Sequence, residues 1–515
     1  MRTLYDLIVA ILCTAILAVF TWIILDPRVG FDDANITQNY AQNIANGLGY
    51  VYYAGGERVE GSTSALWTAV NALGFLITGA PEALLASVGF GCTVGMIFFT
   101  ILIARRLVVM AGLESRYTAI FVALLYACFP ALFGWTVWSL METGLWCFLG
   151  AGFLWASVRL LQTRNRSASQ ADGAALILFA VLMVLTRPEA ILLVSGAVLV
   201  LFLIDRTLPG PRATGLLLLT TGAGIATFLA LTAARTFYFG VPHPNTYYAK
   251  VSTDRIAEIK AGARYTLDYI GQPDTLILFA LAALGPLAVL RLASAPERRA
   301  LISVGVFASA VGIGTVAVYT VLGGDHFGSH RYYQIFLVLL VPSTVLGILW
   351  LSTKFGRTLQ GFALVVSAAL VLQWAAFAAD KGDYEIEFRL AEDARAAGTV
   401  LNQFGDERSV AVYIAGGIAM TYDGPIYDML GLNWSEMAHA DRGRRGSYGA
   451  FSKPVFYQAL PQVVNPQLDA CAADWADNPN VIKAFDNLFQ EAHFRELYVL
   501  DCLDGVSFFR LRSLG

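Results

Sequence analysis

The sequence predicts a polytopic α-helical membrane protein with a small α/β domain after its last transmembrane helix. Of its 515 residues, 57% are hydrophobic and 14% are charged, whereas soluble domains carry about 25% charged residues. The composition changes at Asp380, beyond which charged residues become frequent. We therefore divide the chain into a transmembrane domain, 1–379, and a C-terminal domain, 380–515.

Apolar runs of about 20 residues are long enough to cross a bilayer. The first, Leu7 to Leu25, is long for the apolar part of a signal peptide, and no small-residue cleavage site follows it, so we expect a retained helix. The further runs bring the expected total to about 11 transmembrane helices. They lie near 83–104, 117–134, 142–160, 173–186, 190–205, 213–234, 274–291, 300–322, 332–352 and 358–378.

The apolar segment 64–79 decides the orientation, because every later helix inverts if this segment also crosses the membrane. If it lies along the interface instead, the basic connections fall on the cytoplasmic side, as the positive-inside rule requires. These connections contain Arg105 and Arg116, Arg159 and Arg166, Arg206 and Arg212, Arg291 and Arg299, and Lys354 and Arg357. We therefore expect an integral protein of the inner (cytoplasmic) membrane, with its N-terminus cytoplasmic and its C-terminal domain extracytoplasmic.

The C-terminal domain combines a helical pattern with strand patterns. Residues 384–405 are typical of an amphipathic helix, whereas 409–416, 496–502 and 505–512 are typical of strands. We interpret the short "AGG" at 415–417 as a turn after a strand, because it is too short for a nucleotide-binding fingerprint. Cys471 and Cys502 could pair outside the cell, but their spacing leaves this open.

The first outer loop, 26–82, opens with two adjacent carboxylates, Asp32 and Asp33. Residues 35–46 are typical of a short helix, for which Asp33 is a suitable N-cap. That role for Asp33 leaves Asp32 freer for chemistry, and both aspartates are candidate catalytic residues. A hairpin is expected around Gly55 and Gly56, and Glu60 at its end is the better placed of the later acids to touch a substrate.

Other polar groups gather in the loops expected on the same side of the membrane. Glu142 lies just inside an apolar segment, where a carboxylate is costly and indicates either function or a capped helix start. Arg187 and Glu189 flank a proline at a helix junction. They either pair with each other or leave Arg187 free to bind an anion such as phosphate.

Two further outer stretches add candidate substrate-binding residues. The first supplies His243, Asn245, Tyr247 and Lys250, although tyrosines also gather at membrane interfaces without any function. The second supplies Asp325, His326, His330 and Arg331. Its histidines and aspartate could bind a metal, but the spacing matches no strong zinc signature, and recognition of phosphate or sugar hydroxyls is the favoured interpretation.

These stretches resemble those of the polyprenyl-phosphate-dependent glycosyltransferases of the C type, the GT-C superfamily. The first loop resembles that of the actinobacterial terminal arabinofuranosyltransferases in particular. The matching segments are "FDDANITQNYAQNIANGLGYVYYAGGERVEGSTSALW", "METG", "LTRPEA", "PNTYYAK", "GGDHFGSHRYY" and "YDMLGLNWSEMAH". The chain departs from the family pattern where Asn35 replaces a tyrosine and Asn39 an arginine.

The resemblance implies about 11 helices, a juxtamembrane helix after the first loop, and an active site that faces outward. It also implies a polyprenyl-phosphate-linked sugar as donor, with arabinofuranose the best guess, and a glycan, lipid or protein as acceptor. The first-loop aspartate is the family's base, which maps by position to Asp32. The net charge of −3 gives no general attraction to nucleic acid.

The residues suit this chemistry. A carboxylate can deprotonate the attacking hydroxyl, and cations such as Arg187, Lys250, His330 and Arg331 can stabilise the leaving phosphate. A requirement for a divalent cation stays open, because acids cluster in the first loop. The alternatives are a lipid-linked sugar flippase or another transporter, and a glycan receptor without activity. A transporter would place charges near the bilayer midplane.

Overall fold

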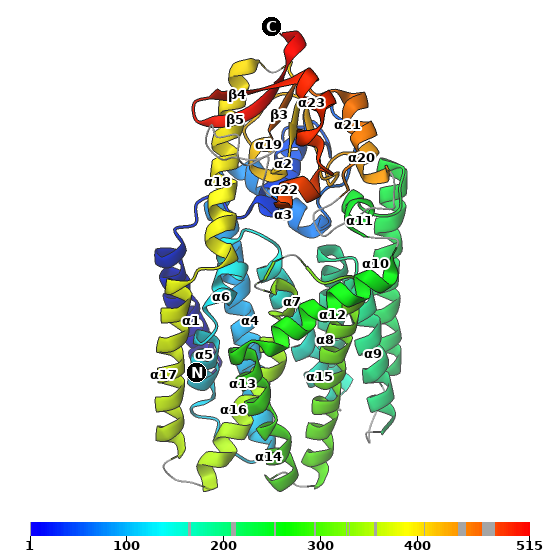
Figure 1. The fold of residues 1–515 in the computed structure, drawn as a ribbon. Coiled ribbons are helices and arrows are strands. Elements are labelled where there is room, and N and C mark those ends of the chain that lie inside the picture. The colour runs from blue at the N-terminus through cyan, green and yellow to red at the C-terminus, as the bar shows by residue number, and fades with distance from the viewer. Residues whose placement is uncertain are drawn as a thin grey trace.

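Figure 1 shows a bundle of long helices with a smaller domain of helices and short strands above it, where the chain ends. The computed structural model describes residues 2–162, 166–207, 213–251, 254–292, 295–325, 327–328, 330–354, 358–405, 407–440, 450–465 and 479–514.

Within these residues, eight helices are long and apolar enough to cross a membrane, or nine if a bent pair counts as one span. The eight spans lie in α1 (Arg2–Leu25), α4 (Glu82–Met110), α7 (Thr143–Gln162), α9 (Ala190–Thr207), α10 (Thr214–Phe239), α13 with α14 (Pro273–Ala282 and Leu284–Leu292), α15 (Ala295–Val321) and α16 (Phe336–Lys354). The bent pair joins α5 (Thr118–Ala127) to α6 and η1 (Pro130–Phe133 and Gly134–Trp138) at an angle of 86°.

The two remaining expected spans are also helical. They are α8 (Arg166–Thr186), whose apolar part is shorter, and α17 (Thr358–Ala379), some of whose side chains lie outside the described residues. The contested segment 64–79 forms α3 (Ala65–Ile77), which has 13 residues. At 1.5 Å per residue such a helix is about 20 Å long, too short for a hydrocarbon core of about 30 Å. This length agrees with a placement along the interface.

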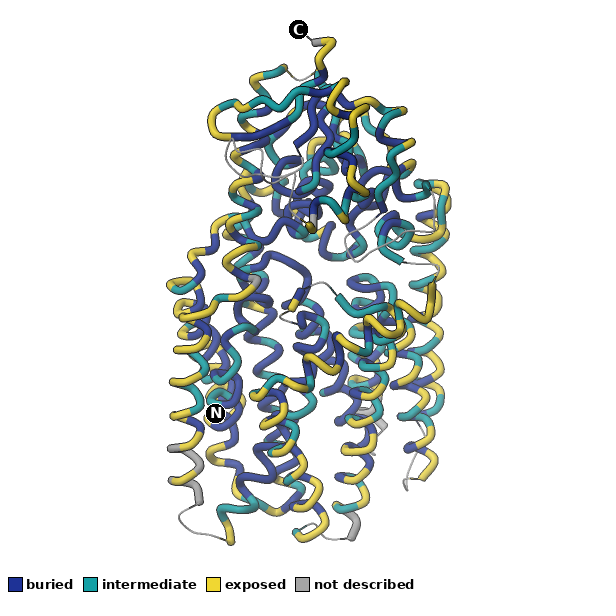
Figure 2. Tube along the Cα trace, in the orientation of Figure 1, coloured by how far each residue is buried: buried dark blue, intermediate teal, exposed yellow. Residues whose placement is uncertain are grey.

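The outward faces of the bundle are apolar and exposed (Figure 2). Leu12 is 54% exposed, Leu219 58% and Leu372 69%. Such surfaces would be unfavourable in water, whereas lipid chains solvate them. The fold is therefore that of an integral membrane protein.

The C-terminal domain contains a five-stranded mixed sheet with the strand order β2-β1-β3-β5-β4. Its strands are β1 (Val410–Val412), β2 (Ile426–Asp428), β3 (Val463–Asn465), β4 (Tyr498–Leu503) and β5 (Val506–Leu511). β1, β2 and β3 are parallel, and β4 and β5 form an antiparallel hairpin. The domain's helices are α18 (Asp383–Leu401), α19 (Ala415–Ala419), α20 (Ser435–His439), α21 (Lys453–Ala459), α22 (Pro479–Ala484) and α23 (Ala492–Leu497).

The small α/β domain is thus confirmed, with α18 and three strands near their expected positions. The pattern did not reveal β2 and β3, because strands of three residues carry little periodicity. Cys502 is disulfide-bonded, and Cys471 lies outside the described residues.

The first outer loop folds as α2 (Asp32–Ala45), one antiparallel bridge between Val51 and Arg58, and then α3. The prediction that Asp33 caps α2 is wrong, because the N-cap is Phe31 and both aspartates lie inside the first turn. Phe31 packs its ring against Trp135 and Phe388 and donates its backbone N–H to the carbonyl of Ser139, so the helix starts earlier than expected. Negative charges are also favourable at this end of a helix.

Candidate active site

A cavity of about 1230 Å³ lies between the bundle, α2 and the C-terminal domain. Its walls also include α11 (Asn245–Lys250) and α12 (Arg255–Gly271), and Figure 1 shows α12 running obliquely across the bundle. Most of the site residues expected from the sequence line this one cavity. They are Asp33, Glu142, Arg187, Glu189, His243, Tyr247, Lys250, Asp325, His330 and Arg331.

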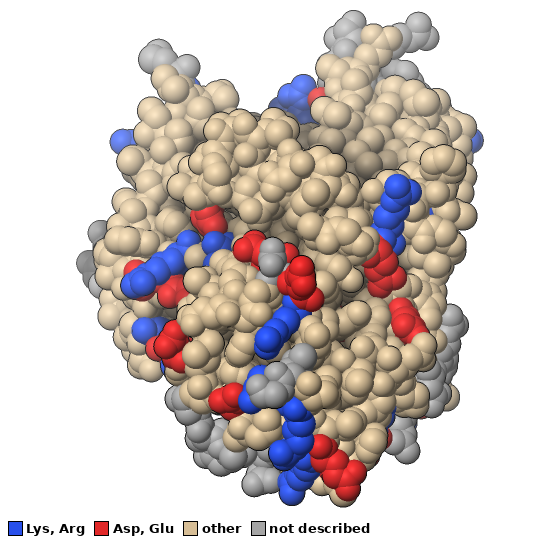
Figure 3. Space-filling view, turned by 90° about the horizontal axis from the view of Figure 1, so that it is seen from above, with Lys and Arg blue, Asp and Glu red and all other residues tan. Residues whose placement is uncertain are grey.

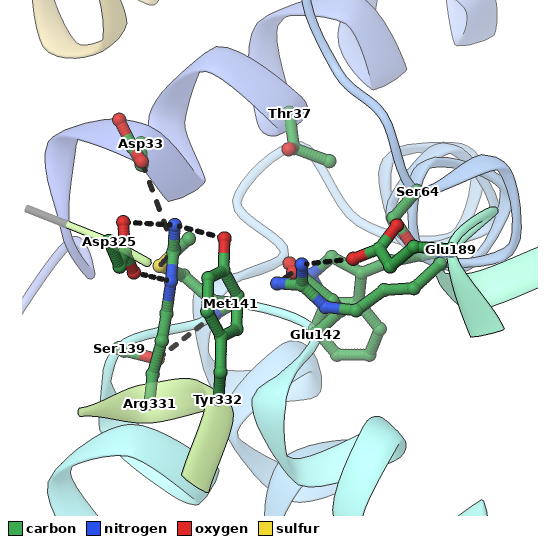
Figure 4. A network of polar contacts seen from close by, with 12 residues as sticks. Asp33, Thr37, Ser64, Ser139, Met141, Glu142, Glu189, Asp325, Arg331 and Tyr332 are labelled. Atoms are coloured by element: carbon green, nitrogen blue, oxygen red, sulfur yellow. Dashed lines mark hydrogen bonds and ion pairs between the residues drawn. The ribbon is translucent and has the colours of Figure 1, made fainter. Parts of the chain in front are cut away.

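Arg331 forms the centre of one charged group. It precedes α16, and its Nε lies 2.5 Å from Oδ2 of Asp325. Its Nη1 lies 3.8 Å from Oδ2 of Asp33 on α2, and its Nη2 donates to the hydroxyl of Tyr332 over 3.2 Å. Figure 4 shows Asp33 above this guanidinium and Asp325 beside it. One buried cation therefore holds two carboxylates from different parts of the chain.

Arg187 forms the second charged group. It pairs with Glu142, and its Nη1 donates to Oε1 of Glu189 over 3.1 Å. The guanidinium carbon also lies 4.5 Å from the ring centre of Tyr332, and that of Arg331 lies 5.0 Å from the same ring. The pairing of Arg187 with Glu189, one of the two interpretations of the sequence, is thus present, and it occurs inside the cavity.

Asp32 faces the other way, towards the C-terminal domain. Its Oδ1 accepts the backbone N–H of Gly417 over 2.7 Å, and its Oδ2 accepts that of Gly416 over 3.0 Å. Burial raises the pKa of Asp32 to about 7, although the two N–H donors act in the opposite direction. A Cβ on Gly416 would lie 1.9 Å from the backbone oxygen of Asp32, so only glycine fits there. The expected turn at 415–417 is the first turn of α19, and it holds this carboxylate.

The two adjacent aspartates therefore have surroundings opposite to those expected. Asp33 lines the cavity beside Arg331, whereas Asp32 does not line it and has both oxygens engaged. Successive residues of a helix point about 100° apart, which separates neighbours in sequence into two sites.

Glu60 and Asn245 also lie outside the cavity. Glu60 is buried and accepts two hydrogen bonds from Arg235, of 2.6 and 2.8 Å. The side-chain amide of Asn245 donates to the carbonyls of Gly431 and Leu432, so it joins α11 to the C-terminal domain.

Arg235 lines the cavity, although it is not among the residues expected from the sequence. It ends a long apolar segment in α10, and a charge in such a segment is a signal that would have identified it.

Lys250 and the unpredicted Arg264 of α12 also line the cavity. Among the described residues, neither has a carboxylate partner within ion-pair distance. The His330 ring packs at a tilt against that of Tyr265, with ring centres 4.6 Å apart, and its Nδ1 lies 3.2 Å from Nε2 of Gln272. The cavity thus holds cations of two kinds, those already paired with carboxylates and those that are not.

His326 lies outside the described residues. In the described part of the chain, no group of three or more His, Cys, Asp or Glu side chains is arranged to hold a metal ion.

The C-terminal domain contributes polar contacts that hold α2 from above. Arg395 of α18 donates to Asn35 over 2.6 Å, to Gln38 over 3.0 Å and to Glu82 over 2.7 Å. The hydroxyl of Tyr40 donates to Oδ1 of Asn433 over 3.1 Å.

The "YDMLGLNWSEMAH" stretch contains Asn433, so it forms part of the contact with Tyr40. Asp428 accepts the backbone N–H groups of Leu430 and Asn433, which fixes the turn that carries Asn433. Burial raises the pKa of Asp428 to about 6.

No protein-family model and no curated protein sequence matches the chain. Solved structures do match. ArnT from Cupriavidus metallidurans in the apo state has a TM-score of 0.57 at 13% identity, with 97% of each chain covered. The same protein bound to undecaprenyl phosphate gives 0.57 at 12% identity, with 98% of each chain covered. An Archaeoglobus fulgidus oligosaccharyltransferase tethered to an acceptor peptide gives 0.50 at 11% identity, over 98% of this chain and 74% of that one.

These similarities show that the chain shares its fold with these solved membrane proteins. The match extends over nearly the whole chain, so it includes both the helical bundle and the C-terminal domain.

Proposed function

We propose that this protein is a membrane glycosyltransferase that uses a polyprenyl-phosphate-linked sugar as donor. The observation that carries the proposal is the cavity, in which Asp33 lies 3.8 Å from a buried arginine that also binds Asp325. The cavity occurs in a fold shared with a protein that binds undecaprenyl phosphate.

The cavity also has a lipid-facing margin, which supports a lipid-linked donor. Ile191 and Leu192 of α9, Phe228 of α10 and Leu322 after α15 line it, and Leu192 is 59% exposed. A polyprenyl chain would lie against this margin in the bilayer while its phosphate reaches the charged groups.

The cavity residues can be given roles in transfer. The acceptor hydroxyl oxygen attacks the anomeric carbon and passes its proton to the carboxylate of Asp33. The bond from the anomeric carbon to the phosphate oxygen breaks, and the electron pair leaves with the polyprenyl phosphate. Lys250 and Arg264 bind that phosphate, because they have no carboxylate partner among the described residues and can neutralise its charge. Arg331 positions Asp33.

This assignment moves the base from Asp32, the residue indicated by family position, to Asp33. A base must reach the hydroxyl that it deprotonates, and Asp33 is the member of the pair that lines the cavity. Asp32 instead positions α2, and with it Asp33, by binding the start of α19.

The sugar and the orientation belong to the same proposal. Arabinofuranose is the best guess, because the first loop resembles that of the terminal arabinofuranosyltransferases. We further propose that the protein lies in the inner membrane with the cavity and the C-terminal domain on the extracytoplasmic side, since this orientation puts the basic connections of the sequence in the cytoplasm.

The test is an assay of purified protein with synthetic polyprenyl-phosphate sugars, measuring sugar transfer and donor hydrolysis. Loss of a general base lowers rates by about 10² to 10⁴-fold, so we expect Asp33→Asn to lose activity on that scale. The matched variant Asp32→Asn should keep a larger part of it, since it leaves the base in place. Failure of the wild-type protein to use any such donor would refute the function, and the reverse order of the two variants would restore Asp32 as the base.

A further inference from the structure

We propose that Thr37 selects the donor sugar by accepting a hydrogen bond from its 2-hydroxyl, the hydroxyl on the carbon next to the anomeric carbon. This inference rests on the proposed function and adds a specificity-determining residue to it. Three hydroxyl groups, from Thr37, Ser62 and Thr68 and here called the hydroxyl chain, fix the direction in which Thr37 can bond.

Thr37 lies on α2 one turn after Asp33, the proposed base. Both residues line the cavity, and side chains four positions apart on a helix lie on the same face, with their Cβ atoms about 5–6 Å apart. Figure 4 shows Thr37 below α2, above the space between Tyr332 and Glu189. A sugar whose anomeric carbon is attacked beside Asp33 therefore presents its neighbouring hydroxyl to Thr37.

The hydroxyl chain leads from the cavity into the protein. Oγ1 of Thr37 lies 3.1 Å from Oγ of Ser62, which lies 3.0 Å from Oγ1 of Thr68 on α3. Thr68 donates to the backbone carbonyl of Ser64 over 2.9 Å. The nearby hydroxyl of Tyr50 donates to the carbonyl of Ser62 over 2.9 Å, so its proton is also engaged. All three members of the chain are buried.

The bond from Thr68 to the Ser64 carbonyl fixes the direction of the other two. A carbonyl oxygen only accepts, and a hydroxyl has one proton and two lone pairs, so Thr68 uses its proton on Ser64. Ser62 must then donate to Thr68, and Thr37 must donate to Ser62. Among the described residues, Thr37 has no other hydrogen-bond partner. It therefore offers the cavity a lone pair and no proton.

This lone pair discriminates between the two ends of the donor head group. The oxygens of an anionic phosphate only accept, so Thr37 repels them and they stay near Lys250 and Arg264. A sugar hydroxyl can donate to Thr37. As positive charge develops on the anomeric carbon, hydrogen bonds to the 2-hydroxyl strengthen in the transition state of glycosyl transfer. Thr37 should therefore contribute to the rate of transfer as well as to binding.

The charge of the outer face gives no other means of selecting the sugar. Figure 3 views the molecule from the side of the C-terminal domain and shows acidic and basic side chains intermixed over the described part of this face. Such a surface has no field of one sign that would attract a charged sugar over a long distance. We therefore attribute the choice of sugar to hydrogen bonds inside the cavity.

The experiment uses the full-length protein and three synthetic polyprenyl-phosphate pentofuranose donors, namely the parent sugar, its 2-deoxy-2-fluoro analogue and its 3-deoxy analogue. Fluorine withdraws electrons as a hydroxyl does but cannot donate a hydrogen bond. The measured quantity is the preference, the ratio of kcat/KM for the parent donor to kcat/KM for the fluoro donor. Comparing this ratio between protein variants cancels the difference in intrinsic reactivity between the donors.

Thr37→Val keeps the shape of the side chain and removes its lone pair. We expect it to lower kcat/KM for the parent donor by about tenfold, equivalent to one hydrogen bond, without lowering kcat/KM for the fluoro donor. Thr37→Ser should keep the wild-type preference. Ser62→Ala releases the proton of Thr37 and should lower the preference by about threefold. Thr232→Val is the matched control, since Thr232 lines the cavity but donates to the carbonyl of Phe228 in its own helix, so the preference should not change.

An unchanged preference in Thr37→Val would overturn the inference, as would an equal loss for the parent and fluoro donors, which indicates a structural effect alone. If Thr37→Val spares the 3-deoxy donor and not the fluoro donor, Thr37 binds the 3-hydroxyl and the assignment is wrong.

Calorimetry with the donors in the absence of acceptor separates this inference from the proposed function. Tighter binding of the parent donor than of the fluoro donor by the wild-type protein, lost in Thr37→Val, supports the role of Thr37 whether or not transfer is observed. Transfer by both proteins with the same preference overturns the inference and leaves the proposed function standing.

Discussion

The two walls of the cavity are held by different interactions. Above the cavity, neutral polar side chains of α2, such as Asn35 and Tyr40, bond to Arg395 and Asn433 of the C-terminal domain. Below it, Arg187 and Arg331 pair with carboxylates from the loops between spans. The upper wall determines where Asp33 lies, and the lower wall supplies the charge around it. Positioning and charge are therefore separable by mutation.

The largest loss of activity is expected when the charge of the lower wall is changed. Arg331→Gln leaves Asp33 and Asp325 without their shared cation, and loss of one such electrostatic group lowers kcat by about 100-fold or more. Arg331→Lys keeps a positive charge and should be less impaired. Single-turnover transfer measures both, and a rate for Arg331→Gln within threefold of the wild-type rate would contradict the assignment.

The cations without carboxylate partners should act on donor binding. Lys250→Gln and Arg264→Gln each remove a charge that we assign to the donor phosphate, and we expect the KM for the donor to rise about tenfold, equivalent to the loss of one charge-assisted hydrogen bond. Lys260→Gln, on the same helix as Arg264, is the control, since Lys260 does not line the cavity. Equal effects in all three variants would show that the positive charges of α11 and α12 act only through general attraction.

The contacts that form the upper wall should be disrupted by a larger side chain. Gly416→Ala places a methyl group against the backbone of Asp32, and overpacking of this kind costs about 1–3 kcal/mol. We expect a lower Tm and a loss of transfer of about tenfold, because Asp33 moves with α2. The control is Gly305→Ala in α15, where an added Cβ meets nothing within 4 Å. An unchanged Tm in Gly416→Ala would show that the two domains are not held together at this point.

The smallest expected effect is a change in how the Tm depends on pH. Burial raises the pKa of Asp32 to about 7, from an ordinary value of 3.8. Since the folded protein holds this proton more tightly than the unfolded chain does, the associated stability is complete below about pH 4 and is lost as the pH rises through about 7. We expect the Tm of the wild-type protein to fall more between about pH 5 and pH 8 than that of Asp32→Asn in the same detergent. Parallel curves would contradict this prediction.

The sequence predicted much of the fold because a membrane requires long apolar helices. The helix positions, the interfacial segment 64–79 and the C-terminal α/β domain all follow from composition and charge. Most of the candidate residues chosen from the sequence line one cavity, since a charged or polar loop such as "TRPEA" is conspicuous between apolar spans.

The partners of those residues were not predictable. The distinction between Asp32 and Asp33 depends on Gly416, which lies 384 positions later, and a local pattern does not show which face of α2 meets the C-terminal domain. Arg395 and Arg264 were missed for a similar reason. Each is an ordinary residue of its own helix, and only the folded chain brings Arg395 to α2 and Arg264 to the cavity.

The attachment of α2 to the C-terminal domain has a consequence for the order of assembly. During synthesis, α2 emerges among the first segments, whereas its partners Arg395, Gly416 and Asn433 belong to the last quarter of the chain. Until they arrive, α2 lacks the bonds to the C-terminal domain that hold it, and with it Asp33, in place. A nascent chain with every apolar span already inserted therefore still lacks the contacts that position α2, and the proposed active site is complete only when residues 395–433 have folded.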